Sequence, residues 1–191
     1  MNPSSALLRA QLRCHPATPV GVALSLSVEL RAHGEALRLR YTLSGDTAAL
    51  RIPAPAAPTP TDGLWQHTCF EAFVAATGEA AYREFNFSPS SQWAAYRFSA
   101  ERERDSAAEA REPALPMPPP LIDTTPRALT LTARVPVTAL PRSPSVLHIG
   151  LSAVIEERDG RLSYWALHHP GERPDFHHPD GRALRLASPL N

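Results

Sequence analysis

The residues best suited to chemistry lie close together between positions 62 and 98, a stretch that holds two of the three tryptophans. Their types suit recognition of a polyhydroxylated ring: an indole or phenol ring packs against apolar C–H groups, and short polar side chains hydrogen-bond hydroxyls. We therefore predict a ligand-binding site formed by Trp65, Trp93, Tyr96, Glu71, Glu84, Asn86 and Arg97. The alternative is that these aromatic rings pack in the core, as large rings commonly do.

Histidines form a second group of candidates, because the pairs 168–169 and 177–178 bracket a loop that also carries Asp175 and Asp180. Imidazole and carboxylate groups suit transition metals. Adjacent residues of a strand point to opposite sides, however, so each pair offers one ligand to a given site. The spacing matches no zinc finger, and we predict no metal site. His168 and His177 stay as candidates for a single haem or metal ligand.

The sequence lacks the motifs of the common catalytic families. It contains no G-x-S-x-G, H-E-x-x-H, G-x-x-x-x-G-K-[ST] or C-x-x-C. Glu71 and Glu84, expected on neighbouring strands, could act as the carboxylate pair of a glycoside hydrolase. Charge pairing with arginine is the commoner role of such residues, and we predict that the protein is not an enzyme.

Apolar residues recur at every second position in most of the chain, which is typical of half-buried strands. The clearest strands are expected at 20–30, 37–43, 65–75, 82–88, 93–98, 128–137, 146–156 and 162–168. Shorter strands are expected within 1–19, at 46–52 and at 183–186, a short helix within 99–114, and irregular backbone at 113–126. The pattern predicts an all-β fold, a two-sheet antiparallel β-sandwich of jelly-roll or immunoglobulin-like topology with few short helices.

Strand alternation also predicts a polar stripe on one sheet surface. Its expected members are His67, Glu71, Tyr82, Glu84, Asn86, Arg134, His148 and Ser152. A polar sheet face of this kind could bind a ligand. It could equally be a solvated face with cross-strand ion pairs.

Bulk composition limits the function classes. The chain has 191 residues, of which 43% are hydrophobic, and this suits a lead-in over 1–19 followed by one domain over 20–187. The formal net charge is zero, which argues against a nucleic-acid partner, and all 19 basic residues are arginine. No run of about 18 apolar residues and no signal-like start is present, so we expect a cytoplasmic protein without membrane contact. Cys14 and Cys69 are then expected as reduced thiols, with Cys69 buried.

Three segments together resemble a known family. They are Trp-x-x-x-Cys-Phe-Glu-Ala-Phe at 65–73, Tyr-Arg-Glu-Phe-Asn-Phe-Ser-Pro at 82–89 followed by Trp-Ala-Ala-Tyr, and Tyr-Trp-Ala-Leu-His-His-Pro with Pro-Asp-Phe-His-His within 164–178. Over roughly 20–187 the chain resembles the bacterial DOMON-like group, which is similar to family 9 carbohydrate-binding modules. Some members of that group are joined to UDP-N-acetylenolpyruvoylglucosamine reductase.

The resemblance implies a β-sandwich that binds sugar or haem without catalysis. Sugar-binding relatives hold the ring between aromatic side chains, a role that carries over to Trp65 and Trp93. Haem-binding relatives use an axial Met and His, whereas the methionines here are Met1 and Met117, the latter in a proline-rich loop. We therefore predict a non-catalytic module for a carbohydrate or a sugar-bearing cell-wall precursor. The alternatives are a domain for haem b or another cofactor, and a protein-interaction module without a small ligand.

Overall fold

The computed structural model of the chain describes residues 7–111, 117–142 and 146–188, and strands dominate these ranges. All pairs between named strands are antiparallel. One layer contains β1 (Leu8–Cys14), β2 (Leu24–His33), β3 (Ala36–Gly45), β8 (Leu121–Thr125) and β9 (Ala128–Pro136). The other contains β4 (Cys69–Ala76), β5 (Tyr82–Phe87), β6 (Trp93–Ala100), β7 (Glu103–Arg104), β10 (Val146–Glu156), β11 (Leu162–Ala166) and β12 (Leu184–Ala187). The predicted all-β antiparallel architecture is confirmed.

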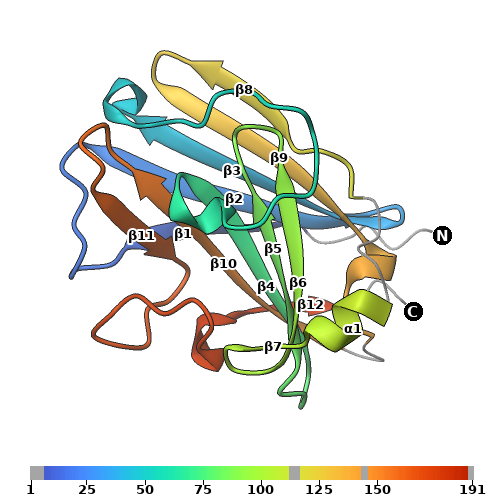
Figure 1. Cartoon of the computed structure of the whole chain (residues 1–191). Coiled ribbons are helices and arrows are strands. Elements are labelled where there is room, and N and C mark those ends of the chain that lie inside the picture. The colour runs from blue at the N-terminus through green and yellow to red at the C-terminus, as the bar shows by residue number, and fades with distance from the viewer. Residues whose placement is uncertain (1–6, 112–116, 143–145, 189–191) are drawn as a thin grey trace.

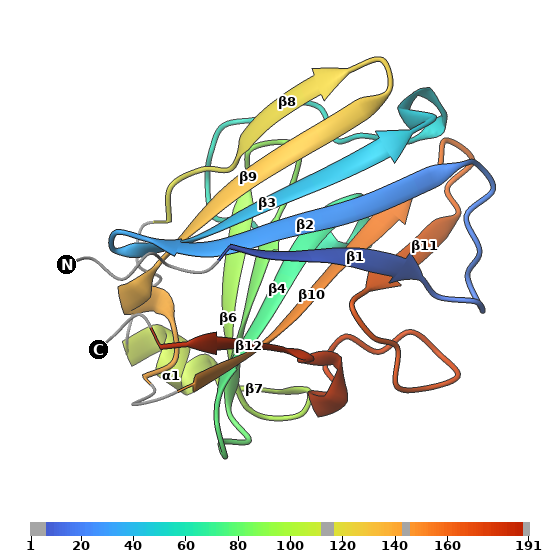
Figure 2. The ribbon, with the colours of Figure 1, turned by 180° about the vertical axis from the view of Figure 1, so that it is seen from behind.

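The strands follow one hydrogen-bonded series, β7-β6-β5-β4-β10-β11-β1-β2-β3-β9-β8, with β12 beside β10. Strand β1 joins the layers, because Leu8 to Leu12 pair with β2 whereas Arg13 and Cys14 pair with β11. Figures 1 and 2 show from opposite sides that the two layers lie face to face. The predicted first strand within 1–19 is thus part of the sheet.

The main core fills the space between the layers. Inward-facing residues alternate along the strands, as Leu26, Val28 and Leu30 do on β2, and all three are at most 1% exposed. Across the gap, the rings of Tyr41 and Phe70 lie 5.1 Å apart. Burying an aliphatic side chain of this size stabilises the fold by roughly 1.5–3 kcal/mol. The alternating apolar pattern of the sequence is therefore what holds the two layers together.

Strand β4 differs from an ordinary sandwich strand because all eight of its residues are buried. Its inward residues enter the main core, while Cys69 and Phe73 pack on its outer side with aromatic neighbours from β5 and β6. Phe176, from the segment before β12, packs against this second cluster. Cys69 is a buried free thiol, as predicted, and Cys14 is also free. The outer face of β4 is thus covered, which creates the enclosure described below.

Two sequence predictions in the first half were wrong. Residues 46–52 form no regular strand: a short 3-10 helix, η1 (Thr47–Ala49), follows Gly45, whose φ is 128°, and only Leu50 forms an isolated bridge. Strand β4 begins at Cys69 rather than at Trp65, because Gly63 at φ 75° starts another 3-10 helix, η2 (Leu64–Gln66). The backbone N–H groups there bond locally instead of to a neighbouring strand. Trp65 therefore projects from a turn.

The connection after β6 was predicted partly correctly. The expected short helix is α1 (Ser106–Arg111), but the small strand β7 before it was not foreseen. The prediction of irregular backbone at 113–126 was wrong where β8 lies, because five residues of β8 pair with β9. Proline density suggested a loop, yet the prolines of this segment lie outside β8 itself. Residues 112–116 lie outside the described residues.

Two further 3-10 helices complete the fold, η3 (Val137–Ala139) after β9 and η4 (Pro179–Gly181) before β12. In the part of the chain that the structure describes, every helix is too short or too polar to cross a membrane.

Candidate functional site

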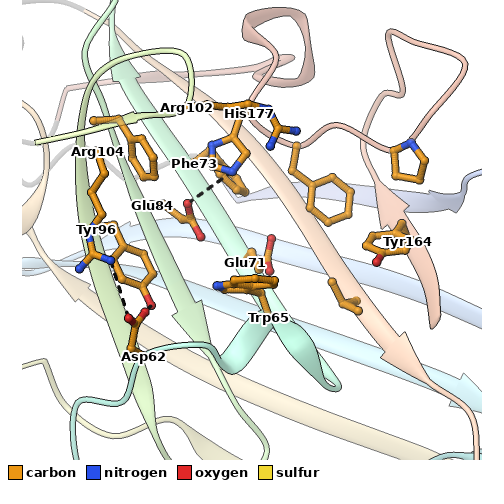
Figure 3. A pocket seen from close by; sticks show the side chains of 14 residues that line it. Asp62, Trp65, Glu71, Phe73, Glu84, Tyr96, Arg102, Arg104, Tyr164 and His177 are labelled. Carbon is orange, nitrogen blue, oxygen red and sulfur yellow. Dashed lines mark hydrogen bonds and ion pairs between the residues drawn. The ribbon is translucent and has the colours of Figure 1, made fainter. Parts of the chain in front are cut away.

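A cavity of about 470 Å³ opens on the outer face of β4, β5, β6 and β10. Strand side chains form its floor, and three covering segments form its walls: the turn at 62–65, β7 with the residue before it at 102–104, and the loop at 174–177. Figure 3 shows Glu71 and Glu84 pointing into this space, with Trp65, Tyr96, Tyr164 and His177 around it. Residues distant in the sequence therefore converge on one enclosure.

Glu71 and Glu84 form the acidic floor. They are only 2% and 4% exposed, and both point outward from the sheet, on β4 and β5. Ser152 Oγ donates to Glu71 Oε2 at 3.3 Å, and Asn86 Nδ2 donates to Glu84 Oε1 at 2.9 Å. Asn86 is the cross-strand partner of Glu71 and lies two residues from Glu84 on β5, so its amide is a neighbour of both acids.

Burial controls the protonation of this floor. Desolvation raises the pKa of Glu84 to about 7, and it holds the pKa of Glu71 well above its usual range, with the charge of Glu84 adding to the effect. A buried charge without a close counter-charge is costly, so a proton is retained instead. The floor is therefore less negative in the free protein than two glutamates would suggest.

His177 caps the floor from the loop at 174–177. Its Nδ1 lies 2.7 Å from the hydroxyl of Tyr82, and its Nε2 lies 4.0 Å from Glu84 Oε2. The ring packs edge-on against Phe73 and Phe98 with centroid distances of 5.2 and 5.1 Å. Burial, and then the nearby charge of Arg102, lower the pKa of His177 to about 4. The imidazole is thus neutral at physiological pH.

Arginines at the rim are already paired with acids of their own. Arg102 donates to Asp175 Oδ1 at 2.9 Å. Arg104 pairs with Glu109 at 3.0 Å and lies 3.8 Å from Asp62, and its guanidinium stacks 4.4 Å from the ring centre of Tyr96. The Tyr96 hydroxyl donates to Asp62, and this hydrogen bond is the main reason why the pKa of Asp62 is lowered. The positive charges of the rim arginines are therefore matched by acidic residues of the rim.

Four of the seven residues predicted for a binding site meet at this cavity: Trp65, Glu71, Glu84 and Tyr96. Trp65 is the most exposed aromatic residue there, at 48%. Asn86 lies beneath them, fully buried and bonded to Glu84, and its Oδ1 has no hydrogen-bond partner among the described residues.

Trp93 and Arg97 lie elsewhere. They share the inward face of β6, opposite Tyr96, because strand residues alternate. Trp93 is 8% exposed and belongs to the main core, whereas Arg97 lines a separate cavity with Arg83 and Leu140. The expectation that Trp65 and Trp93 share one opening is therefore not met, and we do not include Trp93 and Arg97 in the site.

The polar stripe is confirmed in part. Glu71, Tyr82, Glu84, Asn86, His148 and Ser152 do belong to the outer face of β10, β4 and β5. Arg134 was placed wrongly, because β9 pairs with β3 in the other layer. His67 precedes β4, and its Nδ1 lies 2.8 Å from Glu156 Oε2. Of the two histidine candidates, His177 lines the cavity and His168 does not.

Sequence reasoning missed most of the cavity walls. The residues it did not assign are Asp62, Phe73, Phe98, Arg102, Arg104, Val154, Tyr164, Pro174 and Phe176. One signal was present: the segment Pro-Asp-Phe-His-His was part of the family resemblance, and it supplies the covering Phe176 and His177. Among the described residues, no three His, Cys, Asp or Glu side chains gather as they would around a metal ion.

Comparison with known proteins finds similar structures but no match in sequence. No family model matches the chain, and no curated protein matches it in sequence. A structure from Bacteroides uniformis, named a "putative carbohydrate-binding protein", is similar with a TM-score of 0.63 and 15% identity over 91% of this chain and 83% of the other. A family 9 carbohydrate-binding module from Caldicellulosiruptor kristjanssonii, in complex with cellotriose, is similar with a TM-score of 0.53 and 11% identity over 84% of this chain and 72% of the other. The fold is thus similar to that of family 9 carbohydrate-binding modules.

Proposed function

We propose that the protein binds a carbohydrate in the cavity on the outer face of β4, β5, β6 and β10. The main support for this proposal is an exposed indole, that of Trp65, at the wall of a cavity whose floor carries two carboxyl groups. An indole face suits the apolar face of a sugar ring, and carboxyl groups hydrogen-bond its hydroxyls whether protonated or ionised. The fold similarity to carbohydrate-binding modules supports the same assignment.

The cavity size supports a small ligand. Its volume of about 470 Å³ lies in the range of small-molecule sites, which is roughly 300–1,000 Å³. A monosaccharide unit fits such a volume, and a longer chain would extend through the open side. We include a sugar-bearing cell-wall precursor, as the DOMON-like resemblance implies, among the ligand classes of this proposal.

We propose binding without catalysis. A glycoside hydrolase needs one ionised carboxylate and one protonated carboxylic acid. Here burial raises the pKa of both Glu71 and Glu84, that of Glu84 to about 7, so neither stays fully ionised near neutral pH in the free protein. Chromogenic glycosides should therefore remain uncleaved, and measurable turnover that disappears in Glu84→Gln would contradict this part of the proposal.

The test of sugar binding compares two tryptophans. Isothermal titration with mono- and disaccharides and with UDP-N-acetylglucosamine should show binding that Trp65→Ala weakens by about tenfold or more. Trp93→Phe is the matched control, because it removes an indole from the core and should leave affinity unchanged. Absence of heat with every sugar, or equal effects of the two variants, would refute the proposal.

The haem alternative has less support in the geometry. His177 is suitably neutral and lies at the cavity, but Met117, the only described methionine, is 3% exposed and belongs to the main core. An axial Met–His pair is therefore not assembled at this site. Added haemin should give no Soret band that depends on His177, and a band lost in His177→Ala would favour haem over sugar.

A further inference from the structure

Glu71 and Glu84 differ from the other acids near the cavity because they lack a strong cationic partner. Their hydrogen bonds come from the neutral groups of Ser152 and Asn86. Among the described residues, the one basic group within ion-pair distance of Glu84 is His177, at 4.0 Å. Burial keeps that imidazole neutral, so it supplies no positive charge. The floor thus carries two acids without a permanently charged cation at ion-pair distance among the described residues. The charges of Arg104 and Arg102 lower the pKa of Glu84, but less than burial raises it.

The rim arginines do not fill this role. The charge of Arg102 is matched by Asp175, and that of Arg104 by Glu109 and Asp62. Each of these contacts, at 2.9, 3.0 and 3.8 Å, is within ion-pair distance. Turning either arginine toward the floor would leave a partly buried acid unpaired. The counter-charge for the floor must therefore come from a bound molecule, or else the floor stays protonated.

The walls also favour a cation. Five aromatic side chains besides Tyr96 line the cavity: Trp65, Phe73, Phe98, Tyr164 and Phe176. Aromatic rings present a negative face that attracts ammonium groups, and the attraction strengthens when the pair is shielded from water. In Figure 3, Trp65 and Phe73 lie on either side of the two carboxyl groups. Acids at the floor and aromatic rings around it form an arrangement complementary to a protonated amine.

We propose that the preferred ligand is a sugar that carries a protonated amino group, with its ammonium at Glu71 and Glu84 and its ring against Trp65. This inference rests on the proposed carbohydrate-binding function and specifies the ligand class. The ammonium donates charge-assisted hydrogen bonds to the carboxyl oxygens, which are roughly twice as strong as neutral ones. As it binds, the proton retained by the carboxyl pair is released to the buffer, so the net charge of the complex stays balanced.

A neutral sugar meets the same site less favourably. Its hydroxyls would bond to protonated carboxyl groups, and no positive charge would offset the burial of a carboxylate. The difference between a charge-assisted and a neutral hydrogen bond is about 1 kcal/mol or more, which corresponds to about a fivefold to tenfold difference in affinity. The amino sugar should therefore bind more tightly than its hydroxyl analogue.

Matched pairs of sugars test this directly. Titration calorimetry would compare D-glucosamine with D-glucose, D-galactosamine with D-galactose and D-mannosamine with D-mannose, near pH 6.5, where an amine of pKa about 8 is protonated. We expect the amino sugar of at least one pair to bind about tenfold more tightly, with a binding enthalpy that depends on the buffer because a proton is released. N-acetyl-D-glucosamine should lose the advantage, since acetylation removes the charge.

The outcomes separate the two proposals. Equal affinity for both members of every pair would overturn the amino-sugar inference and leave carbohydrate binding intact. Failure of all sugars to bind would overturn carbohydrate binding itself. Tight binding of ethanolamine, which has an amine and no ring, would show that the site recognises amines and not amino sugars, and would also overturn the inference.

Variants locate the effect on the floor. Glu71→Gln and Glu84→Gln should each reduce the preference for the amino sugar to about twofold or less, because each removes a potential carboxylate while preserving the shape of the side chain. Glu29→Gln on β2 makes the same chemical change in the other layer and should keep the full preference. Circular dichroism confirms folding, and if Glu71→Gln fails to fold, Glu84→Gln decides alone. A preference that survives in a folded Glu84→Gln protein contradicts the assignment.

Discussion

Both layers show the same alternation of inward and outward residues, but their outer faces differ in exposure to solvent. On β2, β3 and β9 the outward residues Glu29, Arg38 and Arg134 are half-buried or exposed. On β4 and β5 the corresponding outward residues Glu71 and Glu84 are almost completely buried. The difference comes from the covering segments, since the turn at 62–65 and the loop at 174–177 lie over one layer only.

The covering segments change the pKa of the outward glutamates. On the open face a hydrogen bond from Arg9, at 2.8 Å, lowers the pKa of Glu29. On the covered face desolvation raises the pKa of Glu71 and Glu84. An open polar stripe is therefore a solvated surface, and the same kind of stripe beneath a cover becomes a site with retained protons and room for a ligand.

The largest expected effect concerns packing beneath the cover. Phe73 points outward from β4 yet is 2% exposed and contacts Phe176 and His177, with ring centroids 6.4 and 5.2 Å away. Phe73→Ala should destabilise the protein by about 3–5 kcal/mol, as expected of a core phenylalanine. Thr42→Ala, outward on β3, should cost less than about 1 kcal/mol. Urea unfolding measures both, and similar costs for the two variants would show that the cover does not make a second core.

The next effect is a pH dependence of stability that Glu84 imposes. Its pKa is about 7 in the folded protein and near the ordinary 4.5 when unfolded, so the folded state binds more protons between these values. Stability from this group is complete below about pH 4.5 and is lost as the pH rises through about 7. The loss is on the order of 3 kcal/mol. Burial of Glu71 acts in the same direction.

His177 opposes this trend in part, so a difference between variants gives the clearer measurement. Its pKa of about 4 in the folded protein, below the ordinary 6.5, increases stability as the pH rises between these values. This contribution largely cancels when wild type is compared with Glu84→Gln. Unfolding free energies from pH 4 to 8 should show wild type losing stability relative to Glu84→Gln as the pH rises. A constant difference would mean that Glu84 is solvated.

Much of the fold could be predicted because alternation is a local signal. Glu71, on the strand expected at 65–75, was assigned to the same face as Glu84 on the next strand from period two alone, and the structure agrees. Trp65 was assigned to that strand in error, since a single left-handed glycine, Gly63, starts a turn instead. For Trp93, alternation fixed the side of the strand but not which side faces the core.

The site could be predicted only where it lies on strands. Glu71, Glu84 and Tyr96 were found because their strands fix their direction. Phe176 and Arg102 were missed because a loop carries no periodicity, and the place where it folds back depends on long-range contacts such as that between Arg102 and Asp175. Which layer is covered was therefore beyond what a strand pattern can show.

The smallest expected effect tests the open face. The register places Arg31 opposite Arg38 and Arg38 opposite Arg134, which makes a row of three like charges across β2, β3 and β9. Like charges directly opposite each other destabilise a sheet by a few tenths of a kcal/mol to about 1 kcal/mol. Arg38→Thr relieves two such contacts with a good strand former and should stabilise the protein by about 0.5 kcal/mol at low salt.

Salt and a neighbouring position separate repulsion from propensity. At about 1 M salt, screening within about 3 Å should remove most of the gain from Arg38→Thr. Arg40→Thr makes the same exchange on the same face, but Arg40 lies opposite Glu29, so this variant loses an attraction and should not stabilise. A gain of equal size at both positions and at both salt concentrations would reflect threonine propensity alone. Charge pairs on the open face would then contribute as little to stability as those of a fully solvated surface, and only charges beneath the covering segments would affect stability.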